Sequence, residues 1–147
     1  MNELNCDDAG AVQSSPTVAE AREKQHCNIL IADDEKSVSI SISFIVKRLG
    51  FAVETVDDGE PALEKIRKSP GGYKLLITDH TMLRMDGLQL VGQLNRLRFP
   101  GKILVLTAYL NKDIEDAYKA LGVDSIMHKP FDPGLLRDAV RNLIKTD

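Results

Sequence analysis

The chain has 147 residues, about the length of one domain, and its 19 Lys+Arg against 22 Asp+Glu give a formal net charge of −3. This balance excludes a strongly basic nucleic-acid-binding protein, and the apolar runs are far shorter than the roughly 18 residues that a membrane-spanning helix needs. The two cysteines lack disulfide-framework or metal-ligand spacing and no export signal is visible, so we expect a cytoplasmic protein.

The first 26 residues differ in composition from the rest of the chain. They hold five acidic and two basic side chains and few large apolar ones, so they account for the whole net charge. Such a segment cannot bury enough apolar surface to offset the entropy of ordering it, which predicts a flexible N-terminal extension over 1–26. A short helix over 17–25, capped by Thr17, is the alternative. Residues 27–147 are predicted to form one domain.

Short apolar runs alternate with helical patterns in the rest of the chain. Most of these runs lack polar alternation, which is typical of strands buried on both faces of a parallel sheet, whereas the run that contains Glu54 resembles an edge strand. The predicted strands are 29–32, 51–56, 75–78, 103–107 and 123–127.

Helices are predicted from apolar residues at helical spacing and from end signals. Gly122 is placed to end one helix, and Asp132 and Pro133 have the residue types of a cap and a first helical position. The segment 37–44 alternates with period two, as a strand does, but a parallel pair of strands needs a crossover, so we predict a helix there. The predicted helices cover about 38–49, 58–68, 90–97, 112–121 and 133–145.

This alternation of strands and helices predicts a doubly wound, flavodoxin-like α/β sandwich. Its sheet is expected to be parallel and five-stranded, with order 2-1-3-4-5 and helices on both faces.

Polar side chains stand where the predicted strands end. Asp33 and Asp34 follow the first strand, Asp79 follows the third, Thr107 ends the fourth and Lys129 follows the fifth. Ligands of open parallel sheets bind beyond the carboxyl ends of the strands, so we expect these side chains to share one site.

The charges limit what this site can be. Two carboxylates about 4 Å apart repel each other by roughly 4 kcal/mol at an effective dielectric constant near 20. Either one is protonated or a cation lies between them, and an all-oxygen donor set favours a hard cation such as Mg²⁺ or Mn²⁺. An ionised aspartate beside such a cation favours phosphoryl transfer, with the carboxylate as nucleophile.

Simpler interpretations exist for individual residues. The acidic pair after the first strand could cap a helix, and Asp58 and Asp86 are more typical of caps than of ligands. A transition-metal site built from His80, His128 and the aspartates is a weaker hypothesis, because alternation along a strand turns each histidine away from its neighbour.

Several segments, in order along the chain, resemble the receiver domain of two-component response regulators. Residues 29–35 resemble the first strand and acidic pair of that family, and residues 75–87 resemble its phospho-acceptor strand and loop. Residues 104–108 resemble the switch strand and residues 129–131 the lysine turn, so the resemblance covers about 27–145.

The resemblance implies roles for the site residues. Asp79 would accept a phosphoryl group from a histidine kinase or phosphotransfer protein, in a reaction that depends on Mg²⁺ or Mn²⁺. Asp34 would bind the metal directly, Asp33 largely through water, and the backbone carbonyl of Thr81 would complete the protein's ligands.

Two further residues would contact the phosphoryl group by the same resemblance. Lys129 would pair with it, and Thr107 would turn inward to hydrogen-bond to it. The bond between Lys129 and Pro130 would be cis.

The sequence departs from the family pattern at two places. Leu83 and Arg84 replace the usual Pro-Gly of the loop after the acceptor strand, which puts the usual tight geometry of that loop in doubt. Ile126 stands at a usually aromatic position that couples to the switch threonine, and Tyr109 occupies a position that modulates phosphoryl lifetime in the family.

The expected function is that of a stand-alone receiver and not of an enzyme beyond self-phosphorylation and autodephosphorylation. Its partner surface, by family analogy, would comprise 112–121, 123–127 and 133–145, with no nucleic-acid or membrane partner. One alternative is a Mg²⁺-dependent phosphatase, although such enzymes usually carry a second aspartate at the position of Thr81. A receiver-like module that binds partners without phosphorylation is the other.

Overall fold

The structure, a computed structural model, describes residues 27–145. Strands and helices alternate in the described residues. The strands are β1 (Cys27–Ala32), β2 (Ala52–Val56), β3 (Leu75–Asp79), β4 (Lys102–Thr107) and β5 (Ser125–His128). The helices are α2 (Lys36–Arg48), α3 (Gly59–Lys68), α4 (Gly87–Arg96), α5 (Lys112–Ala120) and α6 (Pro133–Lys145).

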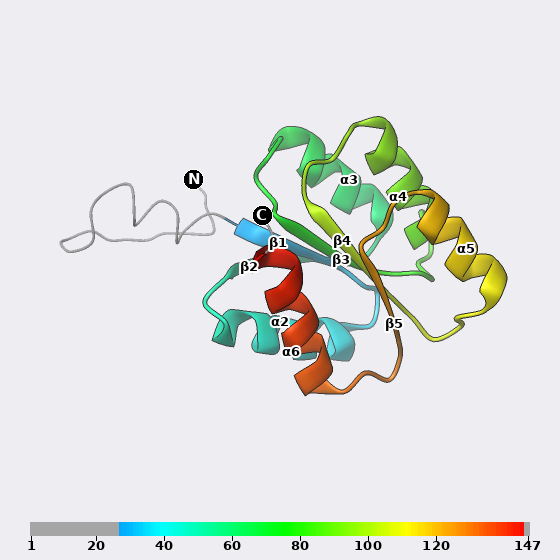
Figure 1. Cartoon of the computed structure of the whole chain (residues 1–147). Coiled ribbons are helices and arrows are strands. Elements are labelled where there is room, and N and C mark those ends of the chain that lie inside the picture. The colour runs from blue at the N-terminus through cyan, green and yellow to red at the C-terminus, as the bar shows by residue number, and fades with distance from the viewer. Residues whose placement is uncertain (1–26, 146–147) are drawn as a thin grey trace.

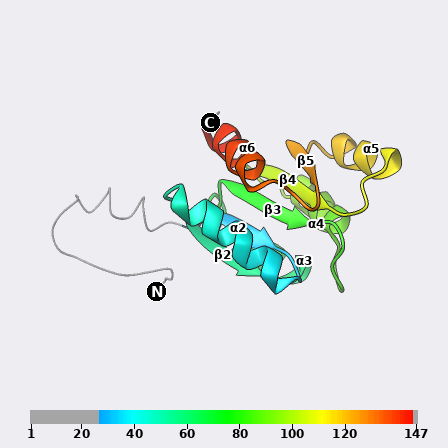
Figure 2. The same cartoon turned by 90° about the horizontal axis from the view of Figure 1, so that it is seen from below.

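The sheet is parallel, with strand order β2-β1-β3-β4-β5. It lies between two helical layers: α2 and α6 cover one face, and α3, α4 and α5 cover the other (Figures 1 and 2). This arrangement confirms the predicted doubly wound sandwich and places β2 at an edge. The expected N-terminal extension and its alternative helix lie outside the described residues.

Each face of the sheet has its own apolar core, because successive residues of a strand point to opposite faces. A strand covered by helices on both sides therefore buries side chains on both faces, and all five residues of β3 are buried, the apolar Leu75 to Ile77 as well as Thr78 and Asp79. Full burial of a Leu or Ile side chain contributes about 1.5–3 kcal/mol to stability. The core under α3–α5 includes Leu30, Leu76 and Val105, and the core under α2 and α6 includes Ile31, Ile77 and Leu104.

The ambiguous segment after β1 is a helix. Ser39, Ile42 and Val46 are its buried residues, at the three- and four-residue spacing of one helix face. Ile40 and Phe44 lie on the exposed side. The apparent strand-like alternation therefore mixes residues from two faces of a helix.

The fifth strand begins two residues later than predicted, at Ser125 instead of residue 123. Val123 lies just beyond the end of α5, and its N–H donates to the carbonyl of Tyr118 in that helix at 3.3 Å. Asp124 then joins the strand to β4, because its carboxylate accepts a hydrogen bond from the N–H of Ile103 at 2.8 Å.

No helix in the part of the chain that the structure describes is long and apolar enough to cross a membrane.

The strand register brings the expected site residues to one edge of the sheet. Ala32 of β1 pairs with Thr78 of β3, so Asp33 and Asp79, which follow them, leave the sheet at the same level. β4 and β5 run parallel to these strands and end at the same edge.

The start of α4 packs so closely under this edge that only glycine fits there. A Cβ at Gly87 would lie 2.5 Å from the carbonyl oxygen of Asp79 and 2.6 Å from the hydroxyl of Tyr118. We expect Gly87→Ala to lower the free energy of unfolding by about 1–3 kcal/mol through this overpacking, measured by urea denaturation. Gly92→Ala in the same helix, where a Cβ meets nothing within 4 Å, is the control and should stabilise by about 0.5–1 kcal/mol. Equal stability of the two variants would contradict the packing argument.

Candidate functional site

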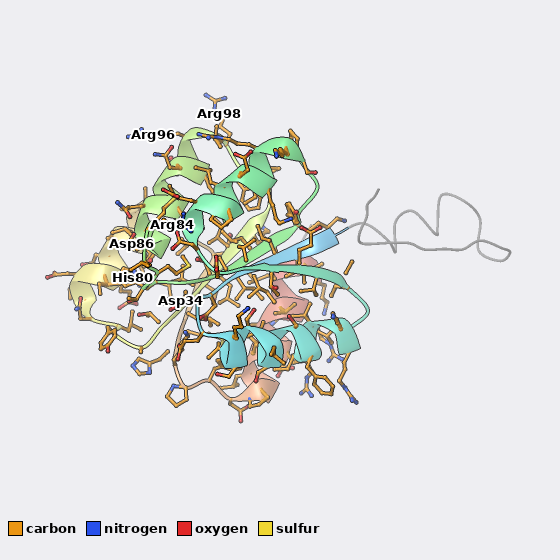
Figure 3. All side chains as sticks on the ribbon, turned by 180° about the vertical axis from the view of Figure 1, so that it is seen from behind. Asp34, His80, Arg84, Asp86, Arg96 and Arg98 are labelled. Atoms are coloured by element: carbon orange, nitrogen blue, oxygen red, sulfur yellow. The ribbon has the colours of Figure 1, made fainter. Side chains whose placement is uncertain are left out.

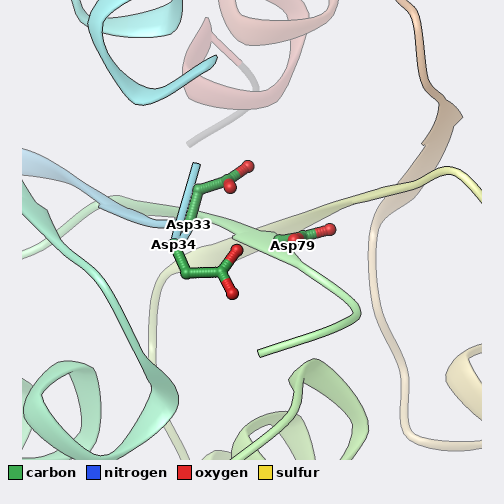
Figure 4. Close-up of side chains that lie close together, drawn as sticks. All are labelled: Asp33, Asp34 and Asp79. Atoms are coloured by element: carbon green, nitrogen blue, oxygen red, sulfur yellow. The ribbon is translucent and has the colours of Figure 1, made fainter. Parts of the chain in front are cut away.

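Three aspartates converge at the carboxyl edge of the sheet (Figure 4). Asp33 and Asp34 follow β1, Asp79 ends β3, and one carboxylate oxygen from each lies within 4.8 Å of the other two. Asp33 and Asp79 are buried, at 3% and 6% exposure, while Asp34 is exposed. The structure therefore brings together the three acidic residues that the sequence analysis singled out, with one of them open to solvent.

Lys129 reaches into this cluster from the end of β5. Its Nζ lies 2.9 Å from Oδ2 of Asp33 and 3.2 Å from Oδ1 of Asp79, and the side chain is 10% exposed. It also lies 3.2 Å from Oε1 of Glu35, a partner that sequence reasoning missed. Burial alone lowers the pKa of the Lys129 ammonium, but the hydrogen bonds and charges of Asp33 and Asp79 outweigh it and leave the pKa above its ordinary value. Lys129 therefore stays charged.

One lysine does not balance the acidic charge. The pKa of Asp79 is raised by burial and by the charge of Asp33, and Lys129 and the N–H of His80 only partly counter that rise. The ionised form of Asp79 thus lacks compensating positive charge in the folded protein. Three carboxylates offer only oxygen ligands, which suit a hard divalent cation such as Mg²⁺. The cation would in turn supply the positive charge that the ionised aspartates lack. Asp33, Asp34 and Asp79 are the residues that would hold it.

The other expected residues lie around this cluster. Thr107 is fully buried at the end of β4, and its hydroxyl accepts a hydrogen bond from the N–H of Tyr109 at 3.0 Å. Thr81 lies in the loop two residues after Asp79 and is exposed. The Lys129–Pro130 bond is cis, as predicted. The contacts of Thr107 and Thr81 with a phosphoryl group and a metal stay predictions.

The loop that departs from the family pattern is held by a buried carboxylate. Asp58 accepts hydrogen bonds from the N–H groups of Arg84 and Met85, both at 2.8 Å, and from that of Glu60 at 3.2 Å. The prediction that Asp58 caps a helix is confirmed, since it is the N-cap of α3, but its hold on the loop was missed. No sequence signal pairs residue 58 with residues 84 and 85. Leu83 at the tip of the loop is 89% exposed.

The two histidines do not join the acidic cluster. His128 is exposed, and Nδ1 of His80 forms a hydrogen bond with the hydroxyl of Tyr118. Burial raises the pKa of Tyr118, as do the charges of Asp86 and Asp79, so its hydroxyl keeps its proton at neutral pH. This geometry gives the transition-metal hypothesis no support. Asp86 caps α4 in a capping box with Gln89, as predicted for a cap.

Comparison with known proteins gives consistent matches. A family model described as "Response regulator receiver domain" matches residues 29–141. The chain is 31% identical over 117 residues to the alkaline phosphatase synthesis transcriptional regulatory protein PhoP of Bacillus subtilis, covering 80% of this chain and 48% of that protein. It is 28% identical over 116 residues to sporulation initiation phosphotransferase F of the same species, covering 79% and 92%.

Solved structures agree with these matches. The chemotaxis protein CheY4 of Vibrio cholerae superposes with a TM-score of 0.73 and 28% identity, covering 80% of this chain and 98% of that one. The chain spans about half the length of several curated relatives that it matches, which are longer proteins.

We predict that Mg²⁺ stabilises the fold through the acidic cluster. Binding to the folded state alone should raise the free energy of unfolding by about 2.7 kcal/mol at a metal concentration 100 times the dissociation constant. Asp34→Asn should lose most of this gain while raising the metal-free stability, because it removes one of the repelling charges. Urea denaturation with and without MgCl₂ measures both effects. Asp57→Asn, at an exposed neighbouring aspartate, is the control and should respond like the unchanged protein.

We also predict a pH-dependent role for Asp58. Burial raises its pKa, but the N–H groups of Arg84, Met85 and Glu60 together bring the pKa below its usual 3.8. The stabilisation is therefore present above pH 3.8 and is lost as the pH falls through the lowered pKa. Asp58→Asn should lower the free energy of unfolding at neutral pH by about 2 kcal/mol, as expected for hydrogen bonds to a charged group.

The difference in free energy of unfolding between Asp58→Asn and the unchanged protein should shrink as the pH falls below 4, because the unchanged protein then loses the same stabilisation. Urea denaturation over a pH series measures the trend. Asp86→Asn is the matched control, since asparagine also caps helices well and should cost little. A deficit of constant size at every pH would contradict the assignment.

Proposed function

The chain belongs to the response regulator receiver domain family, and from this premise we propose that Asp79 accepts a phosphoryl group from a phosphorylated histidine of a kinase or phosphotransfer protein. The observation that carries the proposal is the buried Asp79 carboxylate, 3.2 Å from the Lys129 ammonium and grouped with Asp33 and Asp34. A nucleophilic carboxylate, a fixed ammonium and an all-oxygen cation site are the parts that phosphoryl transfer uses.

In the proposed step, an oxygen of Asp79 forms a bond to phosphorus while the P–N bond of the donor histidine breaks. The electron pair of that bond stays on the histidine nitrogen. Lys129 offsets the negative charge on the phosphoryl oxygens, and Thr107 supplies a hydroxyl from the neighbouring strand end. Mg²⁺ held by the aspartates and the carbonyl of Thr81 would, when bound, neutralise the charge that gathers between nucleophile and phosphoryl group.

We further propose that phosphorylation changes the affinity of a downstream protein for the surface formed by α5, β5 and α6. Large apolar side chains are exposed on or next to these elements and are available to a partner: Leu135 on α6 is 61% exposed, and Tyr109, three residues before α5, is 69% exposed. Independent action of this domain in the cytoplasm is part of the proposal. The independent action draws support from sporulation initiation phosphotransferase F, because the match covers 92% of that protein.

We predict Mg²⁺-dependent phosphorylation at a single residue. Incubation with acetyl phosphate or a phosphorylated histidine kinase should add one acid-labile phosphoryl group, detected by intact mass spectrometry and by Phos-tag gels. Asp79→Asn should abolish it, because the amide is not a nucleophile of this kind, whereas Asp57→Asn should leave it unchanged.

The same assay separates the proposed function from its rivals. Repeated turnover of small phosphoesters would indicate a phosphatase instead of a signalling acceptor. Absence of any phosphorylation, together with no saturable response to Mg²⁺ and beryllofluoride, would indicate an interaction module that works without phosphorylation. Either result would overturn the proposed function.

A further inference from the structure

A histidine and a tyrosine connect the acidic site to α5. His80 follows Asp79 directly, and its Nδ1 lies 2.5 Å from the hydroxyl oxygen of Tyr118. The two rings meet edge to face, with centroids 5.5 Å apart and an interplanar angle of 79°. Figure 3 shows His80 beside α5, which is drawn in yellow. The contact thus joins a residue next to the proposed phosphorylation site with a helix of the proposed partner surface.

Tyr118 attaches α5 to the body of the domain. It is fully buried, and no other residue of this helix is classed as buried. Its ring belongs to the core under α3–α5, where Ile114 and Leu121 pack against the same cluster. A large aromatic ring in a close-packed interior has little room to move independently. A displacement of the Tyr118 side chain therefore displaces α5.

His80 is tied to the state of Asp79 at the other end of the contact. Its backbone N–H donates to Oδ1 of Asp79 at 2.8 Å and to the carbonyl of Leu106 at 3.1 Å. Phosphorylation converts the anionic carboxylate into a neutral acyl group and moves the charge onto the phosphoryl oxygens. The N–H of His80 then faces a weaker acceptor, because hydrogen bonds to charged groups are the stronger ones.

The groups around the contact between His80 and Tyr118 are closely packed. The carbonyl of His80 accepts a hydrogen bond from the N–H of Gly87 at 2.8 Å, and a Cβ at Gly87 would lie 2.6 Å from the hydroxyl of Tyr118. Both ends of the loop from His80 to Gly87 therefore lie close to the tyrosine hydroxyl. Small shifts in such packed groups tend to switch between discrete arrangements instead of being absorbed.

Ile126, which occupies the usually aromatic switch position of the family, cannot link the site to α5 through a hydrogen bond. The resemblance leads us to expect an aromatic ring at position 126, but Ile126 is aliphatic and half-buried, and it packs against the same core cluster that contains Tyr118. An aliphatic side chain has no polar atom, so it forms no hydrogen bond that could change when Asp79 is phosphorylated. Tyr118 has both a buried ring and a hydroxyl, and it contacts the residue next to Asp79.

We propose that the His80–Tyr118 pair carries the phosphorylation state of Asp79 to α5, the role that the resemblance assigns to an aromatic residue at position 126. The inference rests on the proposed function, since it requires Asp79 to be phosphorylated. It adds to that function two residues that transmit the signal without contacting the phosphoryl group.

The test uses the full chain with Mg²⁺ and beryllofluoride, which mimics the phosphoryl group, and follows the amide NMR signals of α5. Tyr118→Phe keeps the buried ring and removes only the hydroxyl. It should bind beryllofluoride within about twofold of the unchanged protein, because the hydroxyl contacts none of the residues that would hold the metal or the phosphoryl group. Its beryllofluoride-induced shifts in α5 should fall by about half or more, because coupling is lost.

Tyr73→Phe is the matched control. Tyr73 is another buried tyrosine, and its hydroxyl donates to Oε1 of Glu54 at 2.8 Å instead of to a residue beside the site. Removing this hydroxyl should leave the α5 response unchanged. An equal loss of response in both variants would indicate general loosening of the core and would overturn the proposal.

His80→Phe and the double variant complete the test. His80→Phe removes Nδ1 from a half-buried position and should reduce the α5 response as Tyr118→Phe does. If the two residues act through one contact, the double variant loses no more than either single variant. If thermal unfolding shows that Tyr118→Phe is not folded, His80→Phe alone tests the proposal.

The outcomes distinguish the two levels of the proposal. A full α5 response in Tyr118→Phe and His80→Phe, with beryllofluoride bound, would overturn the transmission role alone. Failure of the unchanged protein to bind beryllofluoride with Mg²⁺ would overturn the proposed function, and the transmission role with it.

Discussion

The contact between Lys129 and the buried carboxylates is the interaction on which the site depends. Its ammonium lies within 3.2 Å of oxygens of Asp33, Asp79 and Glu35, at the edge where the parallel strands end. One positive charge among these carboxylates leaves the group short of compensation, so Asp79 resists ionisation by burial and by repulsion. A divalent cation bound among these carboxylates would relieve this imbalance, and the cation and Lys129 would together offset the further negative charge of a phosphoryl group.

Much of the fold could be predicted because local patterns and topology agree. Continuous apolar runs indicated the buried strands, and the need for a crossover decided that Ser37 to Phe44 form a helix although they alternate like a strand. The start of β5 could not be predicted, because Val123 is held by α5 and Asp124 by Ile103. Those contacts depend on neighbours in space.

The candidate site shows the same division. Aspartates, a threonine and a lysine at strand ends were enough to propose where the site lies, because parallel strands end at a common edge. Glu35 and Asp58 were missed as partners, since each acts on a segment distant in sequence: Glu35 on Lys129, and Asp58 on the loop at Arg84. A loop that lacks the usual Pro-Gly is thus held by a buried carboxylate, which explains how an altered local sequence remains compatible with the site.

The connection to α5 follows from how few buried groups hold that helix. Tyr118 is the one fully buried side chain of α5, so the position of this helix depends strongly on what that side chain contacts. The hydroxyl of Tyr118 forms its hydrogen bond with His80, whose backbone N–H also donates to the carboxylate of Asp79. His80 therefore contacts both the charged site and the buried side chain of α5. In the transmission role proposed for this pair, a change of charge at Asp79 would alter the position of α5 through these two contacts.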